Sequence, residues 1–290
     1  MGMENLLNYY FIMKKRFVTV LLACSLAGGL FAQQPWFKDK DLTLTGAYYY
    51  PEHWDESQWE RDFKQMHDLG FEFTHFAEFA WAQLEPEEGK YDFAWLDKAV
   101  ALAAKYDLKV IMCTSTATPP VWLSRKYPEI LIKNENGTVL DHGARQHASF
   151  ASPVYRELAY KMIEKLAQHY GNDSRIIGWQ LDNEPAVQFD YNPKAELAFR
   201  DFLREKYHHD IKALNDAWGT AFWSEVYSSF DEITLPKTAQ MFMNHHQILD
   251  YRRFAAGGSR LLVCGRLFPA CFRLPCPGDK KICKEPMGDY

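Results

Sequence analysis

The stretch IIGWQLDNEP, residues 176–185, changes character within a few positions. It begins with a mostly apolar run, after which Asp182, Asn183 and Glu184 follow one another before Pro185. A short apolar run that ends in polar residues and a proline is typical of a buried strand that stops at the protein surface. We therefore expect two carboxylates and an amide at the carboxyl end of this strand.

Three further strands are expected before this one, and helical patterns separate them. Apolar side chains at spacings of three and four predict amphipathic helices between the strand candidates. Ser152 and Pro153 provide an N-cap and a first-turn proline for the helix that precedes residue 176. The expected strands cover residues 42–49, 73–79, 108–113 and 176–181, the helices cover 56–69, 93–106 and a stretch from 153 to about 170, and a long connection covers 114–151.

This alternation favours parallel strands joined by crossover helices, in either a barrel or a doubly wound sheet. None of the four strands is followed by a glycine-rich phosphate loop, which argues against a nucleotide-binding sheet. We therefore predict an α/β fold, a (β/α)8 TIM barrel, of which this chain contains about the first four to five βα units. In such barrels the catalytic residues lie at the carboxyl ends of the strands. Residues 182–184 stand at such a position.

Composition and charge narrow the range of partners. The chain has 290 residues, of which 47% are hydrophobic and 16% aromatic, so it can bury a sizeable core. Its formal net charge of −5 is spread without a basic stripe, so neither nucleic acid nor an anionic membrane surface is an expected partner. A neutral or weakly charged substrate fits better. Aromatic faces stack on sugars but also fill cores, and composition alone leaves both uses open.

The N-terminal residues resemble a targeting signal. Residues 13–32 combine a basic triplet, an apolar segment and a small-residue cleavage region, which predicts a signal peptide. Residues 1–12 look like an upstream extension. The segment from Leu21 to Cys24 also resembles a lipoprotein cleavage box. We expect export to the periplasm or the cell exterior, either in soluble form or as an outer-membrane lipoprotein anchored at Cys24.

Glu184 is the candidate for proton transfer. Breaking a glycosidic bond between neutral sugars needs one carboxyl group that protonates the leaving oxygen and another that attacks or stabilises the anomeric carbon. An Asn-Glu pair by itself does not establish this chemistry. Glu184 could instead cap the helix expected near Pro193 or pair with a surface arginine.

Six phrases in order resemble the N-terminal catalytic domain of family 42 glycoside hydrolases, the β-galactosidases built on a (β/α)8 barrel. They are YYYPEHW at 48–54, AEFAW at 77–81 followed by EP at 85–86, TSTATPPVWL at 114–123, GARQH at 143–147 before SPVY at 152–155, DNE at 182–184 and LNDAWGTAFW at 214–223. The resemblance assigns residues 40–254 to the N-terminal part of such a barrel. It implies a retaining β-galactosidase that hydrolyses terminal β-D-galactosyl residues of oligosaccharides or polysaccharide side chains.

The resemblance also implies roles for particular residues. Glu184 matches the general acid/base, Asn183 a hydrogen-bond partner of the sugar ring, Arg145 the arginine that contacts galactose, and Trp223 a tryptophan that helps to wall the sugar pocket. Other residues near strand ends are expected to support the pocket or to make structural hydrogen bonds: Glu52 and Glu78 in the first role, His53 and His147 in the second.

No cofactor or metal is expected. Some family members hold zinc with a cysteine near the position of Ser149 and more cysteines after the strand-four glutamate, but residues 185–263 contain no cysteine. Full-length members of the family are expected to form homo-oligomers.

Residues 255–290 depart from the family pattern. This tail is rich in cysteine and proline and follows neither apolar period, which we interpret as a frameshift; a genuine disulfide-stapled tail is the alternative. The resemblance places the nucleophile at the end of strand seven, but only about a hundred residues follow Glu184, so we expect this chain to lack that half. Two other functions stay open: another retaining barrel glycosidase, such as a β-glucanase or mannanase, and a non-catalytic sugar-binding remnant.

Overall fold

The computed structural model describes residues 44–143, 145–184, 188–238 and 244–260. The expected signal peptide, Cys24 and residues 261–290 lie outside these ranges, so the predictions about them stay predictions. Thr45 begins the compact unit that contains every helix and strand named below.

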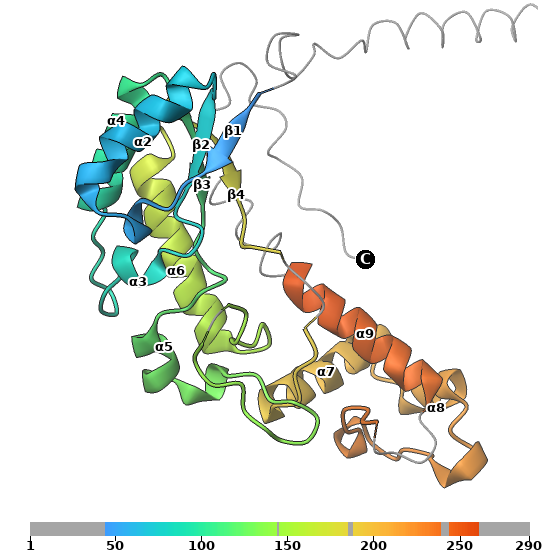
Figure 1. Cartoon of the computed structure of the whole chain (residues 1–290). Coiled ribbons are helices and arrows are strands. Elements are labelled where there is room, and N and C mark those ends of the chain that lie inside the picture. Colours follow the sequence, from blue (N-terminus) through green and yellow to red (C-terminus); the bar gives the residue numbers. More distant parts are fainter. Residues whose placement is uncertain (1–43, 144, 185–187, 239–243, 261–290) are drawn as a thin grey trace, which may run out of the picture. The chain divides into compact units, whose positions relative to one another are not determined.

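Four parallel strands form one sheet, in the order β1-β2-β3-β4. They are β1 (Gly46–Tyr48), β2 (Phe73–Phe76), β3 (Lys109–Cys113) and β4 (Ile176–Gln180). The pairing places Tyr48 opposite His75 and Cys113 opposite Gln180. Parallel neighbours that follow chain order and are joined by helices are the arrangement of consecutive βα units in a barrel wall (Figure 1). The four predicted strands are therefore confirmed, although β1 is shorter than the predicted range 42–49, of which residues 42 and 43 lie outside the described part.

The predicted second strand is too long. It was expected to reach Phe79, but β2 ends at Phe76. The next residue, Ala77, has a φ of 65°, which lies in the left-handed region that an extended strand cannot contain. Hydrophobic patterning carries no information about this change of backbone direction.

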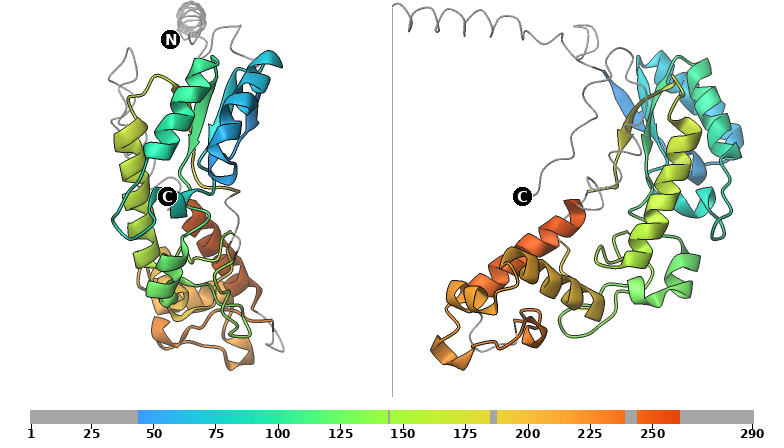
Figure 2. Two further views of the ribbon diagram at one scale, coloured as in Figure 1. Left: turned by 60° about the vertical axis from the view of Figure 1, so that its left-hand side comes forward. Right: turned by 180° about the vertical axis from the view of Figure 1, so that it is seen from behind.

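Three helices cover one face of the sheet (Figures 1 and 2). They are α2 (Glu56–Asp68), α4 (Ala94–Lys105) and α6 (Pro153–Tyr170). The strand side chains Phe76, Val110 and Met112 are fully buried and share one apolar cluster with the inner sides of these helices. Ser152 caps α6 as predicted, because its side chain accepts a hydrogen bond from the backbone N–H of Tyr155.

The opposite face of the sheet is concave. The hydroxyl of Tyr48 on β1 donates to Gln180 Oε1 on β4 at 3.3 Å, although β2 and β3 lie between them in the sheet. The Tyr48 ring also lies 4.3 Å from the ring of His75, and burial lowers the pKa of that histidine. A contact across two intervening strands requires the sheet to curve toward this face, as a barrel wall does.

Short elements connect the strands to the helices. The long connection 114–151 contains α5 (Val121–Lys126) and the 3₁₀ turn η3 (Pro128–Ile130), and α5 begins directly after Pro120. Isolated antiparallel bridges join Leu131 to Ala148 and Lys133 to Val139, so the connection folds back on itself. The turn η2 (Pro51–His53) follows β1, and α3 (Trp81–Leu84) follows β2.

A second apolar cluster follows β4. The helices α7 (Pro193–Lys206), α8 (Ile211–Trp218) and α9 (His245–Arg260), with the turns η4 (Phe222–Ser224) and η5 (Phe230–Glu232), form this part. Phe199, Leu203 and Tyr251 are among its buried residues. The backbone N–H of Lys133 donates to Asp190 Oδ1 at 3.0 Å, which ties the segment before α7 to the connection 114–151.

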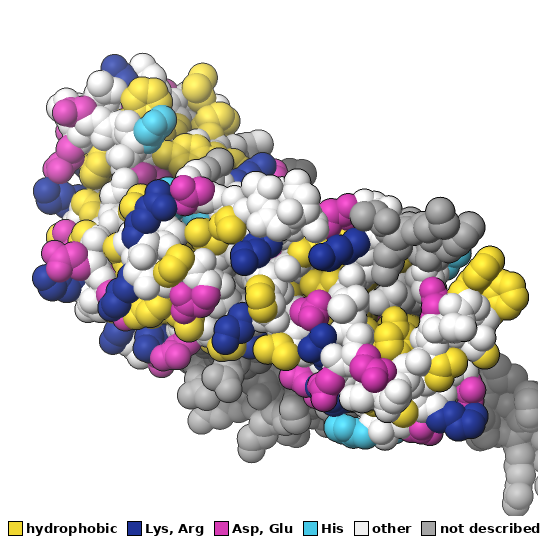
Figure 3. All heavy atoms as spheres, turned by 90° about the horizontal axis from the view of Figure 1, so that it is seen from below, with side chains coloured by type: hydrophobic (Ala, Val, Ile, Leu, Met, Phe, Trp, Pro, Cys, Tyr) yellow, Lys and Arg dark blue, Asp and Glu magenta, His cyan; other side chains and the backbone are white. Residues whose placement is uncertain are grey.

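Two surface properties complete the description. None of the helices in the described part of the chain is long and apolar enough to cross a membrane. On the face shown in Figure 3, acidic and basic side chains are interspersed over the described residues, so this face carries no field of one sign.

Candidate active site

Unusual backbone geometry marks the carboxyl ends of three strands. Ala77 after β2, Ser115 after β3, and Asp182 and Glu184 after β4 all have φ values between 46° and 65°. Residues with side chains rarely adopt this left-handed conformation, and it tends to occur at functional sites where the surrounding structure holds it. The predicted residues 182–184 therefore lie at an edge where the chain turns sharply out of the sheet.

Buried hydrogen bonds hold these turns together. Ser115 Oγ donates to the carbonyl of Ala77, and the backbone N–H of Asp182 donates to Thr114 Oγ1 at 2.9 Å. The Asp182 carboxylate accepts the N–H of Asn183 at 2.7 Å. Burial raises the pKa of Asp182, and the hydrogen bond from Asn183 opposes that rise. Asp182 therefore stabilises the turn, and the two residues after it are free for other roles.

Glu184 is exposed and paired with Arg145. Its side chain is 67% exposed, and Oε2 lies 2.6 Å from Nη2 of Arg145. Pairing with an arginine was one of the alternatives to a catalytic role. Here the partner is the arginine for which the family resemblance implies contact with galactose, so the ion pair brings two predicted site residues together.

Asn183 also contacts Arg145. It is 6% exposed. We assign its amide with the NH₂ group toward Glu78, because both ends have partners only in that orientation: Nδ2 donates to Glu78 Oε1 at 2.8 Å, and Oδ1 accepts from Arg145 Nη1 at 2.5 Å. The structure therefore places three of the four predicted site residues, Arg145, Asn183 and Glu184, in direct contact.

Gln146 fastens the loop that carries Arg145. Its Nε2 donates to the backbone carbonyl of Asn183 at 3.0 Å and to the backbone carbonyl of Glu184 at 2.9 Å. Its backbone N–H donates to the backbone carbonyl of Ala117 at 2.8 Å. Gln146 belongs to the GARQH phrase, but the family resemblance implied no role for it. Its neighbour in that phrase, Arg145, was the available signal.

Two more carboxyl groups lie at strand ends. Glu78 is 5% exposed and accepts hydrogen bonds from Tyr50 Oη at 2.6 Å and from Gln180 Nε2 at 3.1 Å, as well as from Asn183. Burial, with a smaller contribution from the charge of Glu78, raises the pKa of Glu52 to about 7. Glu78 thus contacts a predicted site residue directly, which fits the supporting position expected for it.

The two histidines lie in different environments. His53 ends η2 and is exposed, with its ring 5.8 Å from that of Trp54. His147 is buried, and its ring packs edge-on against His142 at 4.9 Å. The hydrogen-bonding role expected for both rings stays a prediction.

Trp223 lies in the segment after α8. It sits in η4, has a φ of 66°, is 65% exposed, and packs against the ring of Phe222 at 4.8 Å. Its proposed place in the wall of a sugar pocket is not tested by this structure.

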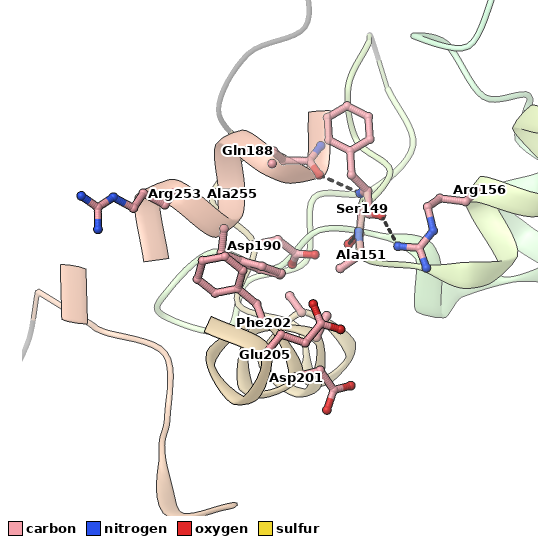
Figure 4. A pocket seen from close by; sticks show the side chains of 15 residues that line it. Ser149, Ala151, Arg156, Gln188, Asp190, Asp201, Phe202, Glu205, Arg253 and Ala255 are labelled. Atoms are coloured by element: carbon pink, nitrogen blue, oxygen red, sulfur yellow. Dashed lines mark hydrogen bonds between the residues drawn. The ribbon is translucent and has the colours of Figure 1, made fainter. Parts of the chain in front are cut away.

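A separate cavity of about 390 Å³ lies among the segment 149–151, α7 and α9 (Figure 4). Its lining includes Arg156, Gln188, Phe202 and Phe254, and none of the four predicted site residues. Its walls mix aromatic rings with charges of both signs. The carboxylate cluster at the strand ends, rather than this cavity, is therefore the candidate site.

Metal ligands do not gather in the described residues, where no group of three or more His, Cys, Asp or Glu side chains could hold an ion. Ser149, which stands near the position of a zinc-binding cysteine in some family members, accepts the backbone N–H of Ala151 at 3.2 Å. Cys113 is buried beside the carbonyl of Asp182, and burial raises the pKa of its thiol to about 12. A neutral thiol is a poor metal ligand.

Comparison with known proteins identifies relatives of the chain and of its fold. A β-galactosidase of Thermus thermophilus is 43% identical over 238 residues, which are 81% of this chain and 36% of that protein. The structure of the Halorubrum lacusprofundi β-galactosidase matches with a TM-score of 0.74 and 39% identity over 79% of this chain and 35% of that one. The structure of the β-galactosidase from Bacillus circulans sp. alkalophilus matches with a TM-score of 0.75 and 30% identity over 80% of this chain and 35% of that one.

The chain thus spans about a third of the length of the relatives that it matches. Its four-stranded sheet forms part of a (β/α)8 barrel of the kind found in the family 42 β-galactosidases. The sequence model of the β-galactosidase family 42 matches residues 48–261, and this range contains every strand but the first two residues of β1 and the whole candidate site. The chain belongs to glycoside hydrolase family 42.

Proposed function

We propose that this chain carries the acid/base half of a retaining β-galactosidase. The observation that supports the proposal most strongly is the contact of Asn183 and Glu184, at the end of β4, with Arg145. A carboxyl group beside an amide and a guanidinium can exchange a proton with a sugar oxygen and hold the neighbouring hydroxyls.

In the proposed reaction Glu184 acts twice. Its carboxyl group first protonates the glycosidic oxygen, which lets the leaving sugar depart while a second carboxylate attacks the anomeric carbon. Glu184, now ionised, then takes a proton from the water that hydrolyses the glycosyl-enzyme. The family resemblance places the second carboxylate at the seventh strand, so turnover requires a protein that continues through that strand.

The Arg145 ion pair has a place in this cycle. An ionised Glu184 holds the guanidinium by charge. A protonated Glu184, as needed for the first step, holds it less strongly, so the planar fork of Arg145 becomes available to the vicinal hydroxyls of a galactosyl ring. Asn183 can hydrogen-bond to the same ring.

The acid role predicts a dependence on the leaving group. In the full-length protein, Glu184→Gln should slow hydrolysis of galactosides with poor leaving groups by about 100-fold or more, because general acid catalysis contributes about 10² to 10⁴ in rate. Aryl galactosides with good leaving groups need little protonation, so the rate of their first step should change little. The measurement is kcat/KM for lactose and for a dinitrophenyl galactoside.

Two controls separate this proposal from its rivals. Glu56→Gln, on the exposed side of α2, should leave both rates unchanged. An equal loss on both substrates in Glu184→Gln would remove the acid assignment. A panel of aryl glycosides tests the sugar: preference for gluco- or manno-configured substrates would indicate a β-glucanase or mannanase, and galactose binding without turnover would indicate a sugar-binding remnant.

We further propose that the protein is exported, on the basis of the signal-like residues 13–32. N-terminal sequencing of the mature protein distinguishes the two routes: a start near Gln33 indicates soluble export, whereas a blocked, lipidated Cys24 in the outer-membrane fraction indicates an anchor. Recovery of the unprocessed chain in the cytoplasm would contradict both.

A further inference from the structure

Glu78 is a buried carboxylate of the candidate site that neither the proposed reaction nor the turn at Asp182 explains. It stands two residues beyond the end of β2 and is 5% exposed. A carboxylate removed from water needs several hydrogen-bond donors, because an unsatisfied buried charge is costly. The groups that donate to Glu78 therefore indicate what the residue does.

Its donors come from two other strand ends. Tyr50, after β1, donates to Oε2 at 2.6 Å. Gln180, the last residue of β4, donates to Oε1 at 3.1 Å, and Asn183 donates to the same oxygen at 2.8 Å. The ring of Tyr50 also lies parallel to that of Phe79, at 5.9 Å, which holds the tyrosine in place. Glu78 thus links the carboxyl ends of strands β1, β2 and β4, next to Asn183.

The carboxylate determines which way the Asn183 amide points. An ionised carboxylate can only accept hydrogen bonds, so the end of the amide that faces Glu78 has to be its NH₂ group. The carbonyl end then faces Arg145, whose guanidinium can only donate, and accepts from Nη1 at 2.5 Å. The reverse orientation would place two acceptors against each other at one end and two donors at the other.

This orientation has a consequence for the site. Two groups hold Arg145 at the same time: the side-chain carbonyl of Asn183 contacts Nη1, and the carboxylate of Glu184 contacts Nη2. One N–H of Asn183 is used by Glu78, which leaves the second N–H as a donor for a sugar hydroxyl. A rotated amide would lose the contact with Arg145 and offer a carbonyl oxygen in place of that donor.

We propose that Glu78 is a positioning residue that fixes the amide of Asn183, and through it Arg145, in the orientation needed beside Glu184. This inference rests on the proposed function for its effect on catalysis. The orientation of the Asn183 amide is independent of the proposed function, because it can be measured without turnover.

The chain offers a matched control in Glu85. This residue is also a buried carboxylate, 1% exposed, and accepts from Trp81 Nε1 at 2.7 Å and from the backbone N–H of Gly89 at 2.8 Å. These donors belong to the connection after β2 and not to β4. Glu78→Gln and Glu85→Gln therefore each neutralise a buried carboxylate of the same region, but only the first removes a partner of Asn183.

The first measurement uses the 290-residue chain labelled with ¹⁵N-asparagine. The Asn183 side-chain signal is identified by its loss in Asn183→Ser. We expect hydrogen exchange of this NH₂ group to be at least about 10-fold faster in Glu78→Gln than in the unsubstituted chain, because its charged acceptor is gone, and to be unchanged in Glu85→Gln. An unchanged exchange rate in Glu78→Gln would overturn the assignment of Glu78.

The second measurement is a double-mutant cycle in the full-length protein. Glu78→Gln should lower kcat/KM for a nitrophenyl galactoside about 10- to 100-fold, since small misplacements of a binding group cost this much. If Glu78 acts through Asn183, the double variant Glu78→Gln/Asn183→Ala should be within about twofold of Asn183→Ala alone. Losses that multiply would show a merely structural Glu78 and overturn the inference.

The two measurements separate the inference from the proposed function. A full-length protein that does not hydrolyse galactosides would contradict the proposed function, while exchange of the Asn183 amide would still support or overturn its orientation by Glu78. Thermal unfolding of Glu78→Gln and Glu85→Gln identifies any variant that has lost its fold. In that event Glu78→Asp, which keeps the charge on a shorter side chain, replaces Glu78→Gln, and exchange equal to that of the unsubstituted chain would count against fixed positioning by Glu78.

Discussion

At the scale of single residues, the environment of each carboxyl group separates the acidic side chains near the strand ends. Asp182 is buried and stabilises a turn. Glu78 is buried and accepts hydrogen bonds from three side chains, whereas Glu184 is exposed and lies beside a guanidinium. Glu52 differs from all of them because its Oε2 is buried without a hydrogen-bond partner. The same functional group thus stands in different environments, three of which suit the structural, positioning and proton-transfer roles that we propose.

Glu52 should make stability depend on pH. Its pKa is raised from 4.5 to about 7, mainly by burial, so the folded chain holds the proton more tightly than the unfolded chain. The free energy of unfolding should therefore fall as pH rises from about 4.5 to about 7, and stay low above that. Glu52→Gln should remove this fall and be more stable than the unsubstituted chain at pH 8, by up to about 3 kcal/mol.

Urea unfolding at several pH values, at one protein concentration, measures this dependence. Glu56→Gln changes an exposed carboxyl of α2 and should follow the unsubstituted chain. Parallel pH profiles for Glu52→Gln and the unsubstituted chain would show that Glu52 is ionised at little cost in the folded state.

At the scale of elements, the packing of β1 against β2 leaves no room for a side chain at Gly46. A Cβ added there would lie 2.5 Å from the carbonyl oxygen of Phe73 and 2.6 Å from its ring. The carbonyl belongs to the paired strand and cannot move without disturbing the ladder. Gly257 in α9 is the opposite case, since a Cβ there meets nothing within 4 Å.

The two glycines should respond to alanine with opposite signs. Gly46→Ala should destabilise the chain by about 1 to 3 kcal/mol, the usual cost of overpacking. Gly257→Ala should stabilise it by about 0.5 to 1 kcal/mol, because alanine favours a helix interior. Chemical denaturation of both variants and of the unsubstituted chain measures these changes in the free energy of unfolding. If Gly46→Ala left that free energy unchanged, β1 would have to shift freely relative to β2.

At the scale of the whole molecule, the described residues form part of a barrel wall. β1 and β4 are the outer strands of the described sheet, and Ile177 on β4 is 45% exposed. Outer strands that expose apolar side chains favour association with another chain. The resemblance places the second carboxylate at the end of the seventh strand, and the described sheet has four strands.

We therefore predict that the 290-residue chain alone does not hydrolyse β-galactosides and forms dimers or larger species. Sedimentation should show a mass above the 33.8 kDa of one chain, and turnover of a nitrophenyl galactoside should not exceed that of Glu184→Gln. A monomeric chain with turnover clearly above this control would contradict both parts. The full-length protein, in contrast, is expected to be active and to assemble as a homo-oligomer.

Local sequence was sufficient for the strands of the sheet, for the helices that cover it and for the position of residues 182–184 at its edge. Apolar periodicity predicted the four strands and the three helices that cover them, and Ser152 and Pro153 marked the start of α6. These features depend on residues within a few positions of one another, so they can be read along the chain. The same holds for Asn183 and Glu184, whose position at the end of an apolar run predicted their place at the edge of the sheet.

Tertiary structure alone decided how the site is assembled. Arg145 reaches Glu184, and Glu78 reaches Asn183 and Gln180, only because strand order and register bring three strand ends together. The orientation of the Asn183 amide follows from the charges on either side of it, which come from distant parts of the chain. The left-handed turn at Ala77 ended β2 early for a similar reason, because contacts such as that from Ser115 hold it. Composition and periodicity describe neighbours in sequence, whereas a carboxylate selects its partners among neighbours in space.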